Sequence, residues 1–127
     1  MALPRLLKTS QRPTPITTKT RGVHLDETLK HVIYANVRTA IGRFGERIHS
    51  VLVWIEDTNG PRDGSGIRCR MVAALARGGR LSASAEASNE YAAVAECASR
   101  ARTLLDRLVK RRRRTRRPPR VLRHQHL

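Results

Sequence analysis

The chain has 127 residues, of which 26 are Lys or Arg and 10 are Asp or Glu, so its formal net charge is +16 at pH 7. This length suits one domain with a modest hydrophobic core, and no apolar run approaches the roughly 20 residues that a membrane-spanning helix needs. The basic excess favours polyanionic partners, nucleic acid before acidic membrane. It is not confined to the C-terminus, because the nine basic residues from Lys110 onward leave 17 basic against 10 acidic residues in the rest of the chain.

The first predicted element is a short strand near the N-terminus. Pro13 and Pro15 discourage regular structure before it, so residues 1–14 are expected to form a flexible arm. The Thr-rich segment 16–21 is typical of a β-strand, and Gly22 ends it.

A helix is predicted next, from an N-cap at Asp26 to about Phe44. Apolar residues recur along it at steps of three and four residues and form one stripe, and Gly42 and Gly45 mark its end. The stripe consists of Leu25, Leu29, Val32, Ile33, Val37, Ala40, Ile41 and Phe44. Four other side chains lie off the stripe: Lys30, Tyr34, Arg38 and Arg43.

Alternating apolar and polar residues predict three more strands, over residues 48–56, 67–76 and 81–87. Segment 57–66 is dense in turn-forming residues, which indicates a hairpin loop longer than two residues. The Arg-Gly-Gly segment 77–79 predicts a tight turn.

The last strand carries small residues on its inner side, Ala83 and Ala85, which allow a helix to pack unusually close to the sheet. Ser88 or Asn89 caps such a helix, and its apolar stripe matches a helix that lies on this sheet. The stripe consists of Tyr91, Val94, Ala98, Ala101, Leu105 and Leu108. The element order is therefore β-α-β-β-β-α, an α+β sandwich of a four-stranded sheet with two helices on one face.

These elements place one domain at residues 15–113. Pro118 and Pro119 stop any helix, so residues 114–127 are expected to be a disordered basic tail.

Catalysis finds little support in the sequence. The five histidines form no HExxH or paired-carboxylate pattern, and segment 57–66 lacks the lysine of a phosphate-binding loop. Cys69 and Cys97 have neither metal-ligand spacing nor a base partner, and we expect them to be small buried thiols in a reducing cytoplasm. We therefore predict no catalytic residue, metal, cofactor or small-molecule substrate.

The basic residues of the last helix carry the clearest functional signal. Four arginines are spaced by seven, four and three residues. Because a helix turns by about 100° per residue, they form one stripe that is separate from the apolar stripe of the same helix. They are Arg100, Arg107, Arg111 and Arg114. A solvated helix face is the ordinary interpretation of a charge run, but such a face mixes signs, and here Asp106 is the nearest countercharge. Clustered guanidinium groups are suited to binding a phosphate backbone through paired hydrogen bonds. Stacking on a base is possible only through Tyr34 or Trp54.

Two segments carry a family resemblance. "SASAEASNEYAAV", residues 82–94, followed by a basic amphipathic helix, is similar to an ASAE-type strand that leads into a D-x-Y-A-A-I helix start, with Asn89 in place of the usual Asp. "ITTKTRGVHLDETLKHVI", residues 16–33, is similar to an opening strand, short link and first helix. In these features residues 16–113 resemble the short ribosome hibernation-promoting factors, also called ribosome-associated inhibitor or sigma-54 modulation proteins.

The resemblance implies a double-stranded-RNA-binding-like domain in the decoding channel of the small ribosomal subunit. There it would overlap the mRNA and the A- and P-site tRNA positions and silence ribosomes in stress or stationary phase. The basic positions that match the family's RNA contacts are Lys30, Arg100, Arg107 and Arg111. With their basic neighbours, the predicted RNA-binding set is Lys30, Arg38, Arg43, Arg100, Arg107, Lys110, Arg111 and Arg114.

The sequence also departs from the family pattern. Thr103 and Asn36 stand where relatives often carry Lys or Arg, and Arg38 and Arg43 are displaced from the usual first-helix positions. The expected partners are the small ribosomal subunit and its RNA, for a cytoplasmic protein that is monomeric when free.

Two other functions stay open. A general RNA- or DNA-binding architectural protein could use the same fold and bind mainly through its arginine tail. A binder of acidic membrane surfaces fits less well, because the basic helix has no apolar face left once its stripe packs in the core.

Overall fold

The computed structural model describes residues 14–58 and 66–116. Within these ranges the chain forms β1 (Ile16–Arg21), α2 (Glu27–Ile41), the 3-10 helix η1 (Gly42–Arg47), β2 (Ile48–Asp57), β3 (Ile67–Leu75), β4 (Arg80–Ala87) and α3 (Glu90–Arg116). The predicted α+β order β-α-β-β-β-α is confirmed. Nearly all of the predicted arm at 1–14, most of the loop at 57–66 and most of the tail at 114–127 lie outside the described residues.

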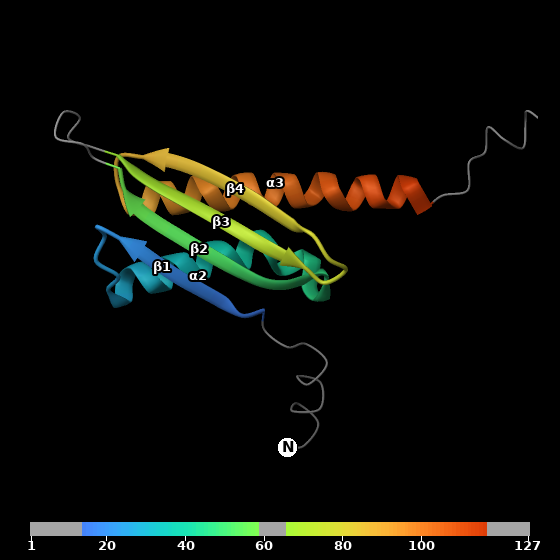
Figure 1. The fold of residues 1–127 in the computed structure, drawn as a ribbon, viewed down its shortest axis with the longest axis horizontal. Coiled ribbons are helices and arrows are strands. Elements are labelled where there is room, and N and C mark those ends of the chain that lie inside the picture. Colours follow the sequence, from blue (N-terminus) through green and yellow to red (C-terminus); the bar gives the residue numbers. More distant parts are fainter. Residues whose placement is uncertain (1–13, 59–65, 117–127) are drawn as a thin grey trace, which may run out of the picture.

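The described strands form one four-stranded sheet in the order β1-β2-β3-β4. β1 runs parallel to β2, and the other two pairings are antiparallel. Parallel neighbours need a crossover connection, which α2 supplies between β1 and β2. Among the described elements α2 and α3 cover one face of the sheet, and nothing covers the other (Figure 1).

Alternation along the strands decides which side chains reach the core. The inward residues of the three longer strands are buried beneath the helices: Val51, Val53, Ile55, Ile67, Cys69, Met71, Ala73, Ala83 and Ala85. The residues between them point the other way, and Arg68 and Arg70 of β3 lie exposed on the uncovered face.

Side-chain caps begin the two described α-helices, as predicted. A carboxylate oxygen of Asp26 accepts a hydrogen bond of 2.8 Å from the backbone N–H of Leu29. The amide oxygen of Asn89 accepts one of 2.8 Å from the N–H of Ala92. Each cap satisfies an N–H group that has no partner within its helix.

The first helix ends earlier than predicted. α2 stops at Ile41 rather than near Phe44, and the chain tightens into η1. Inside η1, Gly45 has a φ of 49°, a left-handed conformation that glycine adopts without steric cost, and this residue turns the chain toward β2.

Small inner residues let α3 lie close to β4. Ala83 is buried beneath α3, and the thiol of Cys97 donates a hydrogen bond of 3.4 Å to its carbonyl oxygen.

A hydrogen bond with Cys97, together with burial, raises the pKa of the Cys69 thiol far above its usual range. Both cysteines are free and buried, which confirms the prediction of small buried thiols.

One residue of the predicted α3 stripe was placed wrongly. Tyr91 is 41% exposed, and the stripe runs instead through Ala93 and Cys97, both fully buried. These small side chains permit the close helix–sheet contact that a tyrosine would prevent. Leu108 is only half-buried, because α3 continues past the end of the sheet (Figure 1).

Candidate nucleic-acid interface

Lys30, Tyr34 and Arg38 form a row on α2, because residues four apart lie on the same side of a helix. The guanidinium carbon of Arg38 lies 5.5 Å from the centroid of the Tyr34 ring, a cation–π contact, and Tyr34 is 46% exposed. Lys30 Nζ lies 3.4 Å from a carboxylate oxygen of Glu27, an exposed pair that costs little to break. The row therefore offers two cations and an accessible ring to a phosphate and a base.

Arg100 joins α3 to the edge strand β4. Its Nη1 donates a hydrogen bond of 2.7 Å to the backbone oxygen of Ser84, and its Nη2 lies 3.0 Å from a carboxylate oxygen of Glu96. Glu96 was missed as a countercharge of the arginine stripe, although its spacing of four residues is the sequence signal for such a pair. The expectation that Asp106 is the nearest countercharge is therefore wrong.

Three further cations of the predicted set lie on the last described turns of α3. The side chains of Arg107, Lys110 and Arg111 are exposed. Within residues 14–58 and 66–116, no carboxylate pairs with Arg107 or Lys110. Arg114 belongs to α3, but its side chain lies outside the described part of the structure.

Arg43 lies at the seam between the helices. Its Nη2 lies 3.8 Å from Oδ1 of Asp106 in α3. This contact joins η1 to α3, so Asp106 offsets the charge of Arg43.

Five of the eight predicted RNA-binding residues therefore lie on two surfaces, whereas Arg43 lies between the helices. The α2 flank, Lys30, Tyr34 and Arg38, lies beside β1, since Lys30 and Tyr34 line a small hollow together with β1 residues. The α3 flank, Arg100, Arg107 and Arg111, begins at the β4 edge, where Arg100 bonds to β4. Because β1 and β4 are opposite edges of the described sheet, the two helices separate the flanks. A ligand that meets both flanks must enclose the helical layer.

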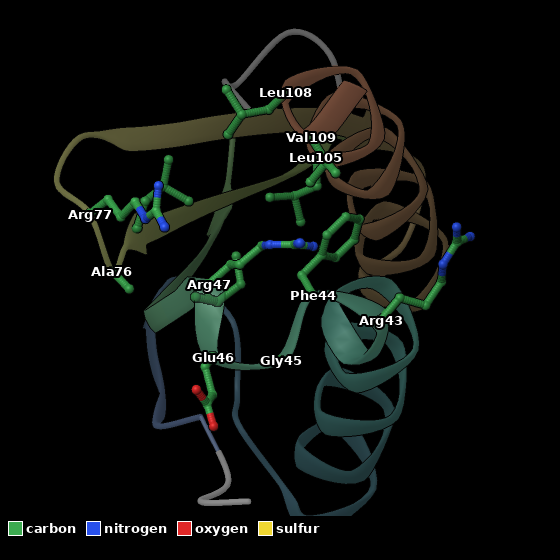
Figure 2. A pocket seen from close by; sticks show the side chains of 12 residues that line it. Arg43, Phe44, Gly45, Glu46, Arg47, Ala76, Arg77, Leu105, Leu108 and Val109 are labelled. Atoms are coloured by element: carbon green, nitrogen blue, oxygen red, sulfur yellow. The ribbon is translucent and has the colours of Figure 1, made fainter. Parts of the chain in front are cut away.

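A hollow of about 540 Å³ opens beside η1, the β3–β4 turn and α3 (Figure 2). Its larger apolar lining residues are Phe44, Ile48, Leu75, Leu105, Leu108 and Val109. Figure 2 shows Arg47 reaching toward Phe44, whereas Arg43 and Glu46 point away from the hollow. Arg47 and Arg77 also line this hollow and do not belong to the predicted RNA-binding set.

The described ranges contain neither a metal-binding cluster nor a membrane-spanning helix. No group of three or more His, Cys, Asp or Glu side chains among them could hold a metal ion. No helix in the same ranges is long and apolar enough to cross a membrane.

Comparisons with known proteins identify the fold. No protein-family model matches the sequence, and no curated protein matches it significantly. Among solved structures, a ribosomal subunit interface protein from Coxiella burnetii has a TM-score of 0.62 and 15% identity, over 76% of this chain and 99% of that chain. The N-terminal domain of Protein Y from Thermus thermophilus has a TM-score of 0.57 and 13% identity, over 76% of this chain and 99% of that chain.

Both solved neighbours belong to the hibernation-promoting factor family, which is the family that residues 16–33 and 82–94 resemble in sequence. At this level of identity the structural match establishes the architecture. The chain therefore has the fold of the hibernation-promoting factor family.

Proposed function

We propose that the protein belongs to the hibernation-promoting factor family and inhibits translation by binding the decoding channel of the small ribosomal subunit. The observation that carries this proposal is the pair of cationic flanks on opposite sides of the helical layer. A channel walled by RNA contacts both flanks at once, whereas a flat or rod-shaped polyanion meets only one. The likeness to a ribosomal subunit interface protein supports the same partner.

In this proposal the protein acts by occupancy alone. Arg107, Lys110 and Arg111 bind ribosomal RNA phosphates, which arginine engages through two hydrogen bonds at a time. On the other flank Tyr34 stacks on an accessible base while Lys30 and Arg38 bind its phosphates. mRNA and tRNA are excluded from the space that the domain fills, and no catalysis, cofactor or small molecule is needed. The protein acts in the cytoplasm, as a monomer when free, during stress or stationary phase.

The alternative is a general RNA- or DNA-binding architectural protein. It would rest on non-specific phosphate contacts, which any positively charged surface makes. The two-sided arrangement favours the ribosome, because non-specific binding to a duplex needs only one positive face.

Sedimentation of a cell lysate through a sucrose gradient distinguishes the two functions. We expect the full-length protein to migrate with small subunits or whole ribosomes, in larger amounts in stationary phase, and to stay there after DNase treatment. Prior loading of purified small subunits with mRNA and initiator tRNA should prevent binding. A protein spread over other nucleic acid, or one that binds loaded and empty subunits equally, would contradict the proposal.

A further inference from the structure

The uncovered face of the sheet carries side chains in ordered cross-strand rows. The register places Thr17, Leu52, Val72 and Ser82 in one row. The next row is Lys19, Trp54, Arg70 and Ser84. The third row is Arg21, Glu56, Arg68 and Glu86.

The third row largely neutralises itself. Arg68 Nη1 lies 3.7 Å from a carboxylate oxygen of Glu56, and Nη2 lies 3.6 Å from one of Glu86. Arg68 is therefore engaged with the sheet's own carboxylates and offers little charge to a ligand.

The Trp54 row is different, because it contains two cations and no carboxylate. Lys19 on β1 and Arg70 on β3 are the direct cross-strand neighbours of Trp54. Nε of Arg70 donates a hydrogen bond of 3.3 Å to Oγ of Ser82, which holds the guanidinium along the sheet surface. In the part of the chain that the structure describes, no carboxylate pairs with Lys19 or Arg70.

Trp54 and its apolar neighbours form the centre of this face. Trp54, Leu52 and Val72 are half-buried by the side chains around them, and no described element covers them. An indole between two cations matches a nucleotide, whose base is a flat ring and whose phosphates are anions.

We propose that this face is a second RNA-binding surface, specific for single strands, in which a base stacks on Trp54 while Lys19 and Arg70 bind the adjacent phosphates. An open β-sheet that carries an aromatic side chain is a suitable stacking platform for splayed-out bases. Duplex RNA does not fit, because its bases are stacked inside the helix. An acidic peptide would use the cations but leave the indole without a partner. The surface lies on the face opposite to the two flanks, so it goes beyond the proposed function.

Trp54 is the only tryptophan of the chain, so its fluorescence reports directly on this face. Titration of the full-length protein with an oligouridylate of about eight nucleotides should give saturable quenching, and duplex RNA of the same length should give none. The variant R100E/R107E/R111E should be quenched as strongly as the wild type. That result shows that RNA binding at Trp54 does not depend on the α3 flank. If the α3 flank proves not to bind the ribosome, the quenching of Trp54 by RNA is still expected.

Affinity for labelled oligouridylate, measured by anisotropy in the R100E/R107E/R111E background, tests the individual residues. Trp54→Ala should weaken binding about 5- to 150-fold, the range of base–aromatic stacking, and Trp54→Phe should restore most of it. Lys19→Gln and Arg70→Gln should each weaken binding even if Trp54→Ala fails to fold. Arg80→Gln, which removes the same charge from the end of β4, is the matched control.

Three results would overturn the proposal. The first is the absence of quenching in the wild type, and the second is equal weakening by Arg70→Gln and Arg80→Gln. The third is a red shift of Trp54 emission when residues 1–13 are removed, together with no quenching by RNA. This result would show that the chain's own N-terminal segment covers the face.

Discussion

The guanidinium of Arg100 donates a hydrogen bond of 2.7 Å to the backbone oxygen of Ser84, across the boundary between α3 and β4. β4 is an edge strand of the described sheet, and an edge strand leaves backbone groups without a ladder partner. Arg100 satisfies one of them, and Glu96 holds its other terminal nitrogen at 3.0 Å. This arginine is thus positioned before any ligand arrives, whereas Arg107 has no carboxylate partner among the described residues.

We expect Arg100→Gln and Arg107→Gln to differ in their effect on stability. Loss of the half-exposed bond to Ser84 should lower the free energy of unfolding by about 0.5 kcal/mol, the weak end of the usual range for a hydrogen bond. Arg107→Gln should leave it unchanged, and both variants should bind small subunits more weakly. Urea denaturation and subunit binding measure the two effects. Equal stability of the two variants would show that the contact with Ser84 contributes nothing to folding.

Close packing of α3 on β4 depends on the small residues beneath it. Ala83 and Ala85 are 5% and 4% exposed. Replacing either with Leu should overpack the interface and lower the free energy of unfolding by about 1–3 kcal/mol. Ser84→Leu, on the uncovered face of the same strand, is the control, and its effect should stay within about 0.5 kcal/mol. A thermal melt in which Ala85→Leu and Ser84→Leu behave alike would contradict the close packing.

The elements could be predicted from sequence because each depends on local chemistry. Asp26 and Asn89 are short acceptors placed directly before apolar periodicity, and both cap a helix in the structure. The Arg-Gly-Gly turn was predictable for the same reason: Gly78 and Gly79 have φ values of 97° and 90°, which few other residues tolerate.

The arrangement of the site could not be predicted in the same way, because it depends on strand order. Helical spacing predicts that Lys30 and Arg100 lie on the exposed faces of two helices. Their position at opposite edges of one sheet depends on long-range strand pairing, which helical spacing does not reveal. Tyr91 fits an apolar stripe by spacing, yet the close approach of α3 favours the smaller Ala93 and Cys97. Trp54 was recognised as a possible stacking residue, but its cationic neighbours on both sides come from the register.

Deletion of residues 117–127 tests how much of the binding resides in the C-terminal segment. It removes three of the 26 basic residues and leaves every described element intact. We expect a thermal melt like that of the full chain and ribosome binding that is weaker but retained, because the flanks remain. Complete loss of ribosome binding would favour the architectural alternative, in which the tail supplies most of the affinity.

Charge reversal on the α3 flank is the strongest test of the proposed function. R100E/R107E/R111E should abolish small-subunit binding and relieve inhibition in a cell-free translation assay. The fold should persist, since all three side chains are exposed and the apolar stripe of α3 is untouched. The loss of the Arg100 bond to Ser84 should lower stability only slightly.

Salt dependence supplies an independent readout of the same flank. Each phosphate contact releases condensed counterions, so the logarithm of the wild-type affinity should fall with the logarithm of salt concentration, by about 0.7–0.9 per contact. Single reversals at Arg107 or Arg111 should reduce that slope by roughly one contact each. The matched control is R21E/R80E, which reverses two exposed cations on edge strands outside both flanks. Only a docking surface of fixed geometry makes charges at one place contribute more to affinity than charges at another. If R21E/R80E loses as much affinity per reversed charge as R100E/R107E/R111E, the protein has no such surface and binds as a diffuse polycation.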